Sequence, residues 1–183
     1  VPTACVRDSE AVDGTKKSMP ILVAVSRKYK YVFSSVVPKK GPDPYAVRRL
    51  GRDLANILGH KRLIVKDDQE PAIVRLRQEV KREFNLEIMD EESPVGDSQS
   101  NGEAENAVGR VTAQARTLKC GLESRLGETL ANDSSLLPWL IRYAGVTISY
   151  FQVGTDGKTA YRRLKGRDFH RPITEFGECI WYK

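Results

Sequence analysis

Two kinds of hydrophobic pattern alternate along the chain, and their order constrains the fold more than any other feature of the sequence. Short runs rich in Val, Ile and aromatic residues predict strands, whereas apolar residues that repeat every three or four positions predict helices. The predicted strands span residues 2–8, 20–26, 29–37, 62–66 and 86–89, and the predicted helices span residues 43–58, 71–84 and 101–126. This β-β-β-α-β-α-β order, followed by a long helix, predicts an α/β domain whose mixed five-stranded sheet is flanked by helices.

The long helix has one face for the core and another that is free for function. Its apolar residues recur at steps of three and four, which is typical of a buried stripe. The stripe consists of Ala104, Val108, Val111, Ala115, Leu118 and Leu122. Glu105 lies away from this stripe and shares its face with Gly109, Thr112, Arg116 and Lys119. The sequence therefore predicts that Glu105 faces outward from the first turn.

The last third of the chain predicts further short elements. Asp133 or Ser134 is expected to cap another helix, in which Trp139 and Tyr143 pack into the core. A turn at 154–157 and a short helix at 159–164 should follow, and residues 178–182 have the composition of a strand.

The chain has a net charge of +6, and its charged residues are distributed unevenly along the sequence. Residues 27–82 hold 15 basic and 6 acidic side chains, whereas residues 85–105 hold 7 acidic and no basic ones. A basic surrounding can bind phosphates while a local acidic cluster binds metal ions. The distribution favours a polyanionic partner, although ordinary scatter of surface charge would also produce it.

Several classes of protein are disfavoured by composition. The three cysteines are far apart and only two histidines are present, so we expect neither a disulfide framework nor a zinc module, and a reducing compartment fits best. No apolar run approaches the roughly 18 residues of a membrane helix, and we expect no membrane partner. The chain starts at Val1 without the features of a signal peptide, which suggests a fragment.

Two acids occupy positions that suit metal chemistry. Asp68 comes where a strand ends and a helix begins, which is the edge where reactive groups collect in α/β sheets. Glu105 lies in the first turn of the long helix, and Glu103 competes with it for the same role. Each acid also has a structural interpretation, because Asp68 could cap the next helix and Glu105 could interact with the helix dipole.

Three passages resemble the catalytic core of retroviral and copia-type retrotransposon integrases, a branch of the RNase H-like superfamily. They are Asp68-Gln-Glu-Pro71, the run from Asp97 to Asn106 with Asn101-Gly102 before Glu105, and the stretches 157–166 and 176–182. The resemblance implies an RNase H-like three-layer fold. It makes Glu105, not Glu103, the third acid of an Asp, Asp, Glu triad, with 36 residues between Asp68 and Glu105.

The first acid of that triad departs from the family's pattern. Asp8 on the first strand is the assigned ligand, but Arg7 would occupy the acid's position if the register follows Val1. Strand alternation would then aim Asp8 at the wrong face of the sheet unless a bulge turns it back. Asp13 in the following turn is a weaker alternative.

The resemblance also implies a function. Asp8, Asp68 and Glu105 would be the catalytic residues and would bind two Mg²⁺ or Mn²⁺ ions for 3′-end processing and strand transfer of element DNA into target DNA. The enzyme would be an endonuclease and nucleotidyltransferase of DNA recombination, homo-oligomeric and nuclear, with residues 1–153 as the core and 154–183 as a linker and C-terminal extension. Asn101, Gly102, Arg116 and Lys119 are the expected DNA contacts. The alternatives are a catalytically impaired DNA-binding remnant, or another RNase H-like nuclease or transposase.

Overall fold

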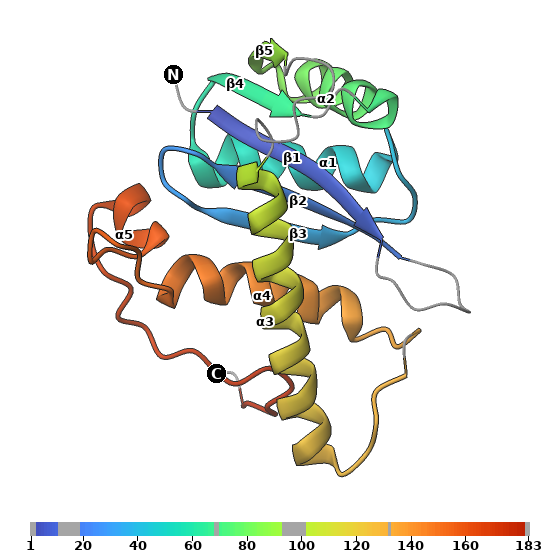
Figure 1. The fold of residues 1–183 in the computed structure, drawn as a ribbon, viewed down its shortest axis with the longest axis vertical. Helices are drawn as coiled ribbons and strands as arrows, with labels where there is room; N and C mark the ends of the chain where they lie inside the picture. The colour runs from blue at the N-terminus through green and yellow to red at the C-terminus, as the bar shows by residue number, and fades with distance from the viewer. Residues whose placement is uncertain (1–2, 11–18, 68–69, 93–101, 132, 182–183) are drawn as a thin grey trace.

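Five strands form one mixed sheet in a computed structural model of the chain (Figure 1). The structure describes residues 3–10, 19–67, 70–92, 102–131 and 133–181, with the backbone alone for 3–10 and 92. The strands are β1 (Thr3–Glu10), β2 (Pro20–Ser26), β3 (Val32–Val36), β4 (Arg62–Asp67) and β5 (Glu87–Glu92), in the order β3-β2-β1-β4-β5. β1 and β3 are both antiparallel to β2, whereas β4 is parallel to both β1 and β5. The predicted mixed α/β class is confirmed.

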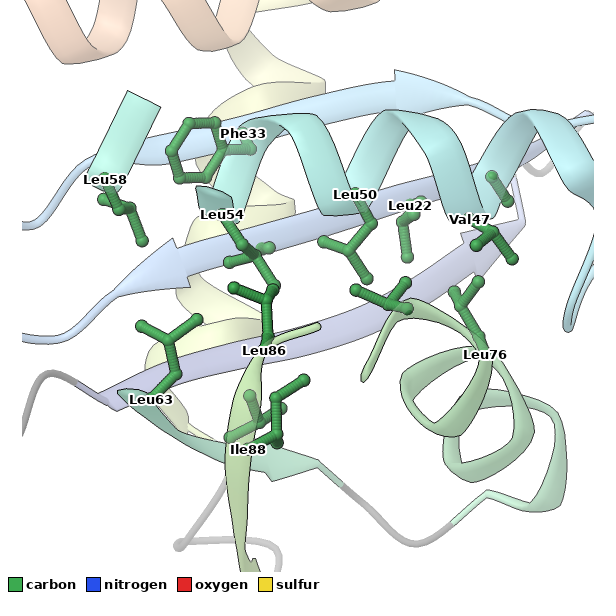
Figure 2. Close-up of a cluster of buried hydrophobic side chains, with 14 of the residues drawn as sticks. Leu22, Phe33, Val47, Leu50, Leu54, Leu58, Leu63, Leu76, Leu86 and Ile88 are labelled. Carbon is green, nitrogen blue, oxygen red and sulfur yellow. The ribbon is translucent and has the colours of Figure 1, made fainter. Parts of the chain in front are cut away.

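Helices cover both faces of the sheet. They are α1 (Pro44–Arg52), the π-helix η1 (Asp53–Leu58), α2 (Pro71–Phe84), α3 (Gly102–Leu126), α4 (Leu137–Phe151) and α5 (Ala160–Lys165). One buried cluster joins α1, η1 and α2 to the sheet face that carries Leu22 and Phe33, and Figure 2 shows its leucines converging from these elements. A second cluster joins α3 and α4 to the opposite face, which carries Val23 and Val25. Alternate residues of β2 therefore serve different layers.

The helix boundaries follow from the local signals in the sequence. The Asp43 carboxylate accepts a hydrogen bond from the Tyr45 amide at 2.9 Å, and Pro44 occupies the first turn of α1. Gly59 ends η1 with φ at 70°, a conformation that glycine adopts without steric cost. α3 begins one residue after the predicted start and buries most of the predicted stripe. Its first half lies over the sheet and its second half extends beyond it (Figure 1).

α4 covers the outer edge of β3. The Ser149 hydroxyl accepts a hydrogen bond from the Val32 amide at 2.9 Å and donates one to the Val32 carbonyl at 3.1 Å. Arg142 of α4 reaches past this edge to the buried Asp53 carboxylate, with two N–O distances of 2.7 and 2.6 Å. The two Ser149 hydrogen bonds satisfy backbone groups of Val32 that an edge strand would otherwise expose.

Three predictions for the last third of the chain are wrong. α4 begins at Leu137, with Pro138 in its first turn, so neither Asp133 nor Ser134 is its N-cap. Trp139 is 71% exposed because it lies in that first turn, away from the buried face of the helix. Residues 178–181 form no strand, because the tail before them packs on helices: the Tyr143 hydroxyl donates to the Thr174 carbonyl, and Phe176 packs against the α3–α4 cluster.

The segment after α4 packs against the rest of the molecule. The Tyr150 ring of α4 contacts the rings of Tyr161 and Phe169, with centroids 4.8 and 4.6 Å apart. Ala160 is buried in the cluster that contains α1 and α2. The division at residues 153 and 154 into a core and an extension stays a prediction.

Within the described residues, no helix combines the length and the apolar character needed to cross a membrane.

Candidate active site

Glu105 lies on the exposed side of the first turn of α3. Its neighbours Ala104 and Ala107 are buried against the sheet at 3% and 1% exposure, which turns Glu105 outward. Gly102, the first residue of the helix, is exposed beside it, and a Cβ there would meet no atom within 4 Å. The Glu105 carboxylate therefore stands at a helix N-terminus, where the dipole favours negative charge.

Glu103, the competing acid, is held by the turn between β2 and β3. Its carboxylate lies 2.7 Å from the Lys30 ammonium and 3.7 Å from the Arg27 guanidinium. These ion pairs tie the start of α3 to the end of β2. Glu103 thus has a structural role, which leaves Glu105 as the candidate ligand in this turn.

Two acids, Asp67 and Asp68, are consecutive in the sequence, and β4 ends at the first of them. Asp67 is 3% exposed and follows Leu63 and Val65 in the row of β4 that is buried on the α2 side. Its carboxylate lies 2.5 Å from Arg77 of α2, a guanidinium that also contacts Asp90 at 3.0 Å. Because the buried Asp67 carboxylate is engaged by the partly buried Arg77, it is unsuited to bind a metal ion. Asp68, the predicted ligand, lies outside the described residues.

Asp8 occupies a continuous stretch of β1. From Ala4 to Glu10 every residue pairs with a successive residue of β2, so this part of the strand contains no bulge. Asp8 pairs with Leu22, which belongs to the cluster on the α1 side, whereas Arg7 pairs with Val23 under α3. Directly opposed residues share a face of an antiparallel sheet. The register therefore places Arg7, and not Asp8, among the alternate residues of β1 that belong to the sheet face covered by α3. Asp13, the weaker alternative, lies outside the described residues.

The row of Asp8 on β1 speaks against it as the partner of Glu105, and its assignment as a ligand stays a prediction.

The expected DNA contacts are spread along α3. Asn101 lies outside the described residues. Arg116 is exposed, and Lys119 is half-buried with its ammonium 3.7 Å from the Glu123 carboxylate. At about 1.5 Å of rise per residue, Arg116 and Lys119 lie about 17 and 21 Å along the helix from Glu105. They share its face but belong to the part of α3 that extends beyond the sheet.

Arg110 of α3 and Arg163 of α5 are not among the DNA contacts expected from the sequence. Arg110 donates to the Gln152 side-chain oxygen at 3.2 and 2.6 Å, which joins α3 to the end of α4. Burial and, to a smaller extent, the charge of Arg163 lower the pKa of Arg110. Arg163 in turn makes a bidentate ion pair with Asp156, which holds the pKa of that carboxyl far below its usual range. In the sequence, the basic residues at 27–30 are the feature that could have indicated a cationic surface near Arg110 and Arg163.

The predicted ligands of the candidate metal site are all carboxylates. Oxygen ligands of this kind suit Mg²⁺ and Mn²⁺. Among the described side chains, no group of three or more His, Cys, Asp or Glu residues is arranged to hold a metal ion. Glu105 fits such an ion by its chemistry, its exposure and its position at the start of α3.

The fold matches those of retroviral integrase core domains. The catalytic core domain of BIV integrase is similar over 90% of this chain and 93% of its own, with 15% identity and a TM-score of 0.58. The HTLV-2 integrase catalytic core domain in complex with magnesium, in its dimeric form, is similar over 90% and 95%, with 15% identity and a TM-score of 0.62. In a simian T-cell lymphotropic virus intasome the match covers 99% of this chain but 60% of that one, with 17% identity and a TM-score of 0.65. At sequence level, no protein-family model and no curated protein matches.

Proposed function

We propose that this chain, whose fold is that of an integrase core of the RNase H-like superfamily, is a metal-dependent polynucleotidyl transferase that cleaves and joins DNA. The observation that carries the proposal is the exposed Glu105 in the first turn of α3, on this fold, with Glu103 beside it engaged by Lys30 and Arg27. An exposed carboxylate in the first turn of a helix that packs on the sheet suits a metal ligand.

In this proposal Asp68 and Glu105 bind Mg²⁺ or Mn²⁺, and Asp8 is the predicted third ligand. The ions would supply activation of the attacking hydroxyl and stabilisation of the leaving oxygen of a phosphodiester. The protein's own part is to hold the carboxylates on rigid elements. Arg77 keeps Asp67 buried and out of the site, and the ion pairs of Glu103 fix the first turn of α3.

The substrates in this proposal are the ends of element DNA and a target DNA. In processing, water would cleave a phosphodiester near the 3′ end and release the terminal nucleotides. The exposed 3′-hydroxyl would then attack a phosphodiester of the target strand, become joined to the target's 5′-phosphate and release a target 3′-hydroxyl. The neighbours described as an intasome and as dimeric and trimeric cores support a homo-oligomer on DNA. The nucleus, where chromosomal DNA lies, is the proposed location.

The register of β1 favours a second candidate, a DNA-binding domain that has lost the first acid. Arg7 occupies the row of Val23 that lies under α3, and the pairing from Ala4 to Glu10 contains no bulge to bring Asp8 into that row. A cation in place of a carboxylate would repel metal ions. This candidate keeps the fold and the DNA partner but not the reaction.

A joining assay separates the candidates. The purified chain is incubated with Mn²⁺ and a labelled duplex that carries a recessed 3′-hydroxyl, beside Asp68→Asn, Glu105→Gln and the control Glu83→Gln on the exposed side of α2. The proposal predicts joined products longer than the input for the wild type and the control, and none for the two site variants. DNA binding without cleavage or joining in the wild type would favour the second candidate, and cleavage without joining would indicate a hydrolytic nuclease.

A further inference from the structure

Three cations are grouped in the turn between β2 and β3. Arg27, Lys28 and Lys30 are exposed there, and the Arg27 and Lys30 side chains are accessible by 59% and 51%. Lys28 lies over the Tyr29 ring at 5.3 Å, so its ammonium stays at the surface. The turn presents a concentrated positive charge.

Two further cations join this turn from distant parts of the sequence. The Arg163 guanidinium of α5 lies 3.5 Å from the Tyr29 carbonyl, and Figure 1 shows α5 at the side of the sheet where β2 passes into β3. Arg110 lies on α3 one and a half turns after Glu105, within the electrostatic influence of Arg163. We call Arg27, Lys28, Lys30, Arg110 and Arg163 the basic surface.

The basic surface is wider than its local carboxylates can neutralise. Glu103 serves both Lys30 and Arg27, and Asp156 serves Arg163. Among the residues that the structure describes, Lys28 and Arg110 have no acidic partner. Lys28 lies over the Tyr29 ring, and Arg110 donates to the Gln152 side-chain oxygen. An excess of positive charge, exposed at Lys28 and half-buried at Arg110, therefore remains beside the first turns of α3.

We infer that the basic surface binds the phosphate backbone of duplex DNA and holds it beside Glu105. This inference rests on the proposed function and adds to it the face by which DNA approaches the carboxylates. Long, exposed lysine and arginine side chains can follow a row of phosphates without reading bases. The same two turns of α3 carry Glu105 and contact the basic surface, so a strand bound there lies next to Glu105.

The test is duplex binding without metal, measured by fluorescence anisotropy in EDTA at 50 to 200 mM salt. The variant Arg27→Gln, Lys28→Gln, Lys30→Gln removes charge but keeps amide groups that can hydrogen-bond to Glu103. The matched control Arg48→Gln, Arg52→Gln, Arg75→Gln removes the same charge from exposed positions of α1 and α2, on the other face of the sheet. We expect the turn variant to bind about 10- to 100-fold more weakly and to lower the salt slope by about 2 to 3, and the control to bind like the wild type.

A single substitution guards against loss of structure. Lys28 contacts only the Tyr29 ring among the described residues, so Lys28→Gln should keep the thermal unfolding curve and still lower the salt slope by about 1. Equal affinity and slope for the turn variant and the wild type would overturn the inference, as would an equal loss in the control. Those outcomes leave the joining assay intact, whereas a wild type that binds no duplex would overturn both proposals.

Discussion

Asp67 and Asp68 are adjacent acids, and we expect their substitutions to have different effects. In Asp67→Asn, a buried carboxylate that bonds Arg77 at 2.5 Å becomes a neutral amide, and Arg77 keeps only the half-exposed Asp90 as an acidic partner among the described contacts. Breaking a buried pair costs about 3 to 5 kcal/mol, and a charged hydrogen bond alone about 1.5 to 3. Because Asn still accepts a hydrogen bond and Asp90 remains, we expect the free energy of unfolding to fall by about 2 to 3 kcal/mol. This loss corresponds to a fall in Tm of about 4 to 12 °C.

Thermal unfolding with and without Mn²⁺ distinguishes the two roles. A ligand at about 100 times its Kd stabilises the folded state by about 2.7 kcal/mol. We expect Asp67→Asn to lower Tm while keeping the Mn²⁺-induced rise, and Asp68→Asn to lose that rise. If Asp67→Asn unfolds like the wild type, or if it abolishes the response to Mn²⁺, then Asp67 does not have the structural role assigned to it.

Three further substitutions test the packing that positions the site. Gly145→Ala would place a methyl group 2.4 Å from the Ser34 hydroxyl. We therefore expect the free energy of unfolding in urea to fall by about 1 to 2 kcal/mol, despite the better helix propensity of alanine. An unchanged midpoint would contradict the close approach of α4 to β3. Gly121→Ala meets no atom within 4 Å and should raise stability by about 0.5 to 1 kcal/mol in the same measurement, whereas a loss would show a hidden contact. Arg142→Met leaves the buried Asp53 carboxylate without its bidentate partner and should cost about 3 kcal/mol in calorimetric or urea unfolding, and a cost below about 1 kcal/mol would show that water replaces the arginine.

The elements that sequence predicts well are those with a local cause. α2 follows its predicted range because Pro71 starts it, and the apolar spacing of Ile73, Leu76 and Val80 selects its buried face. The outward position of Glu105 follows in the same way from the buried stripe of α3. In both cases neighbours within two turns carry the information.

The elements that sequence predicts badly depend on distant contacts. Residues 178–182 have strand composition, but the tail before them packs on α3 and α4 through Tyr143 and Phe176. Trp139 is apolar, yet its place in the first turn of α4 leaves it exposed. Tertiary placement overrides composition in both cases.

The candidate site was predictable only in part for the same reason. The choice of Glu105 over Glu103 was made from a motif, and the structure adds the physical cause, an ion pair to Lys30 across 73 positions of sequence. The row of Asp8 depends on its pairing with Leu22, which strand propensity alone does not specify.

The most direct test of the metal site is anomalous diffraction from crystals of the chain soaked in Mn²⁺. We expect a manganese peak within coordination distance, about 2.0 to 2.3 Å, of carboxylate oxygens of both Asp68 and Glu105, and no peak at Asp67. Crystals of Glu105→Gln should lose the peak. A manganese ion bound elsewhere with Glu105 uncoordinated, or bound by Asp67 in place of Asp68, would show that Asp68 and Glu105 do not form the metal site.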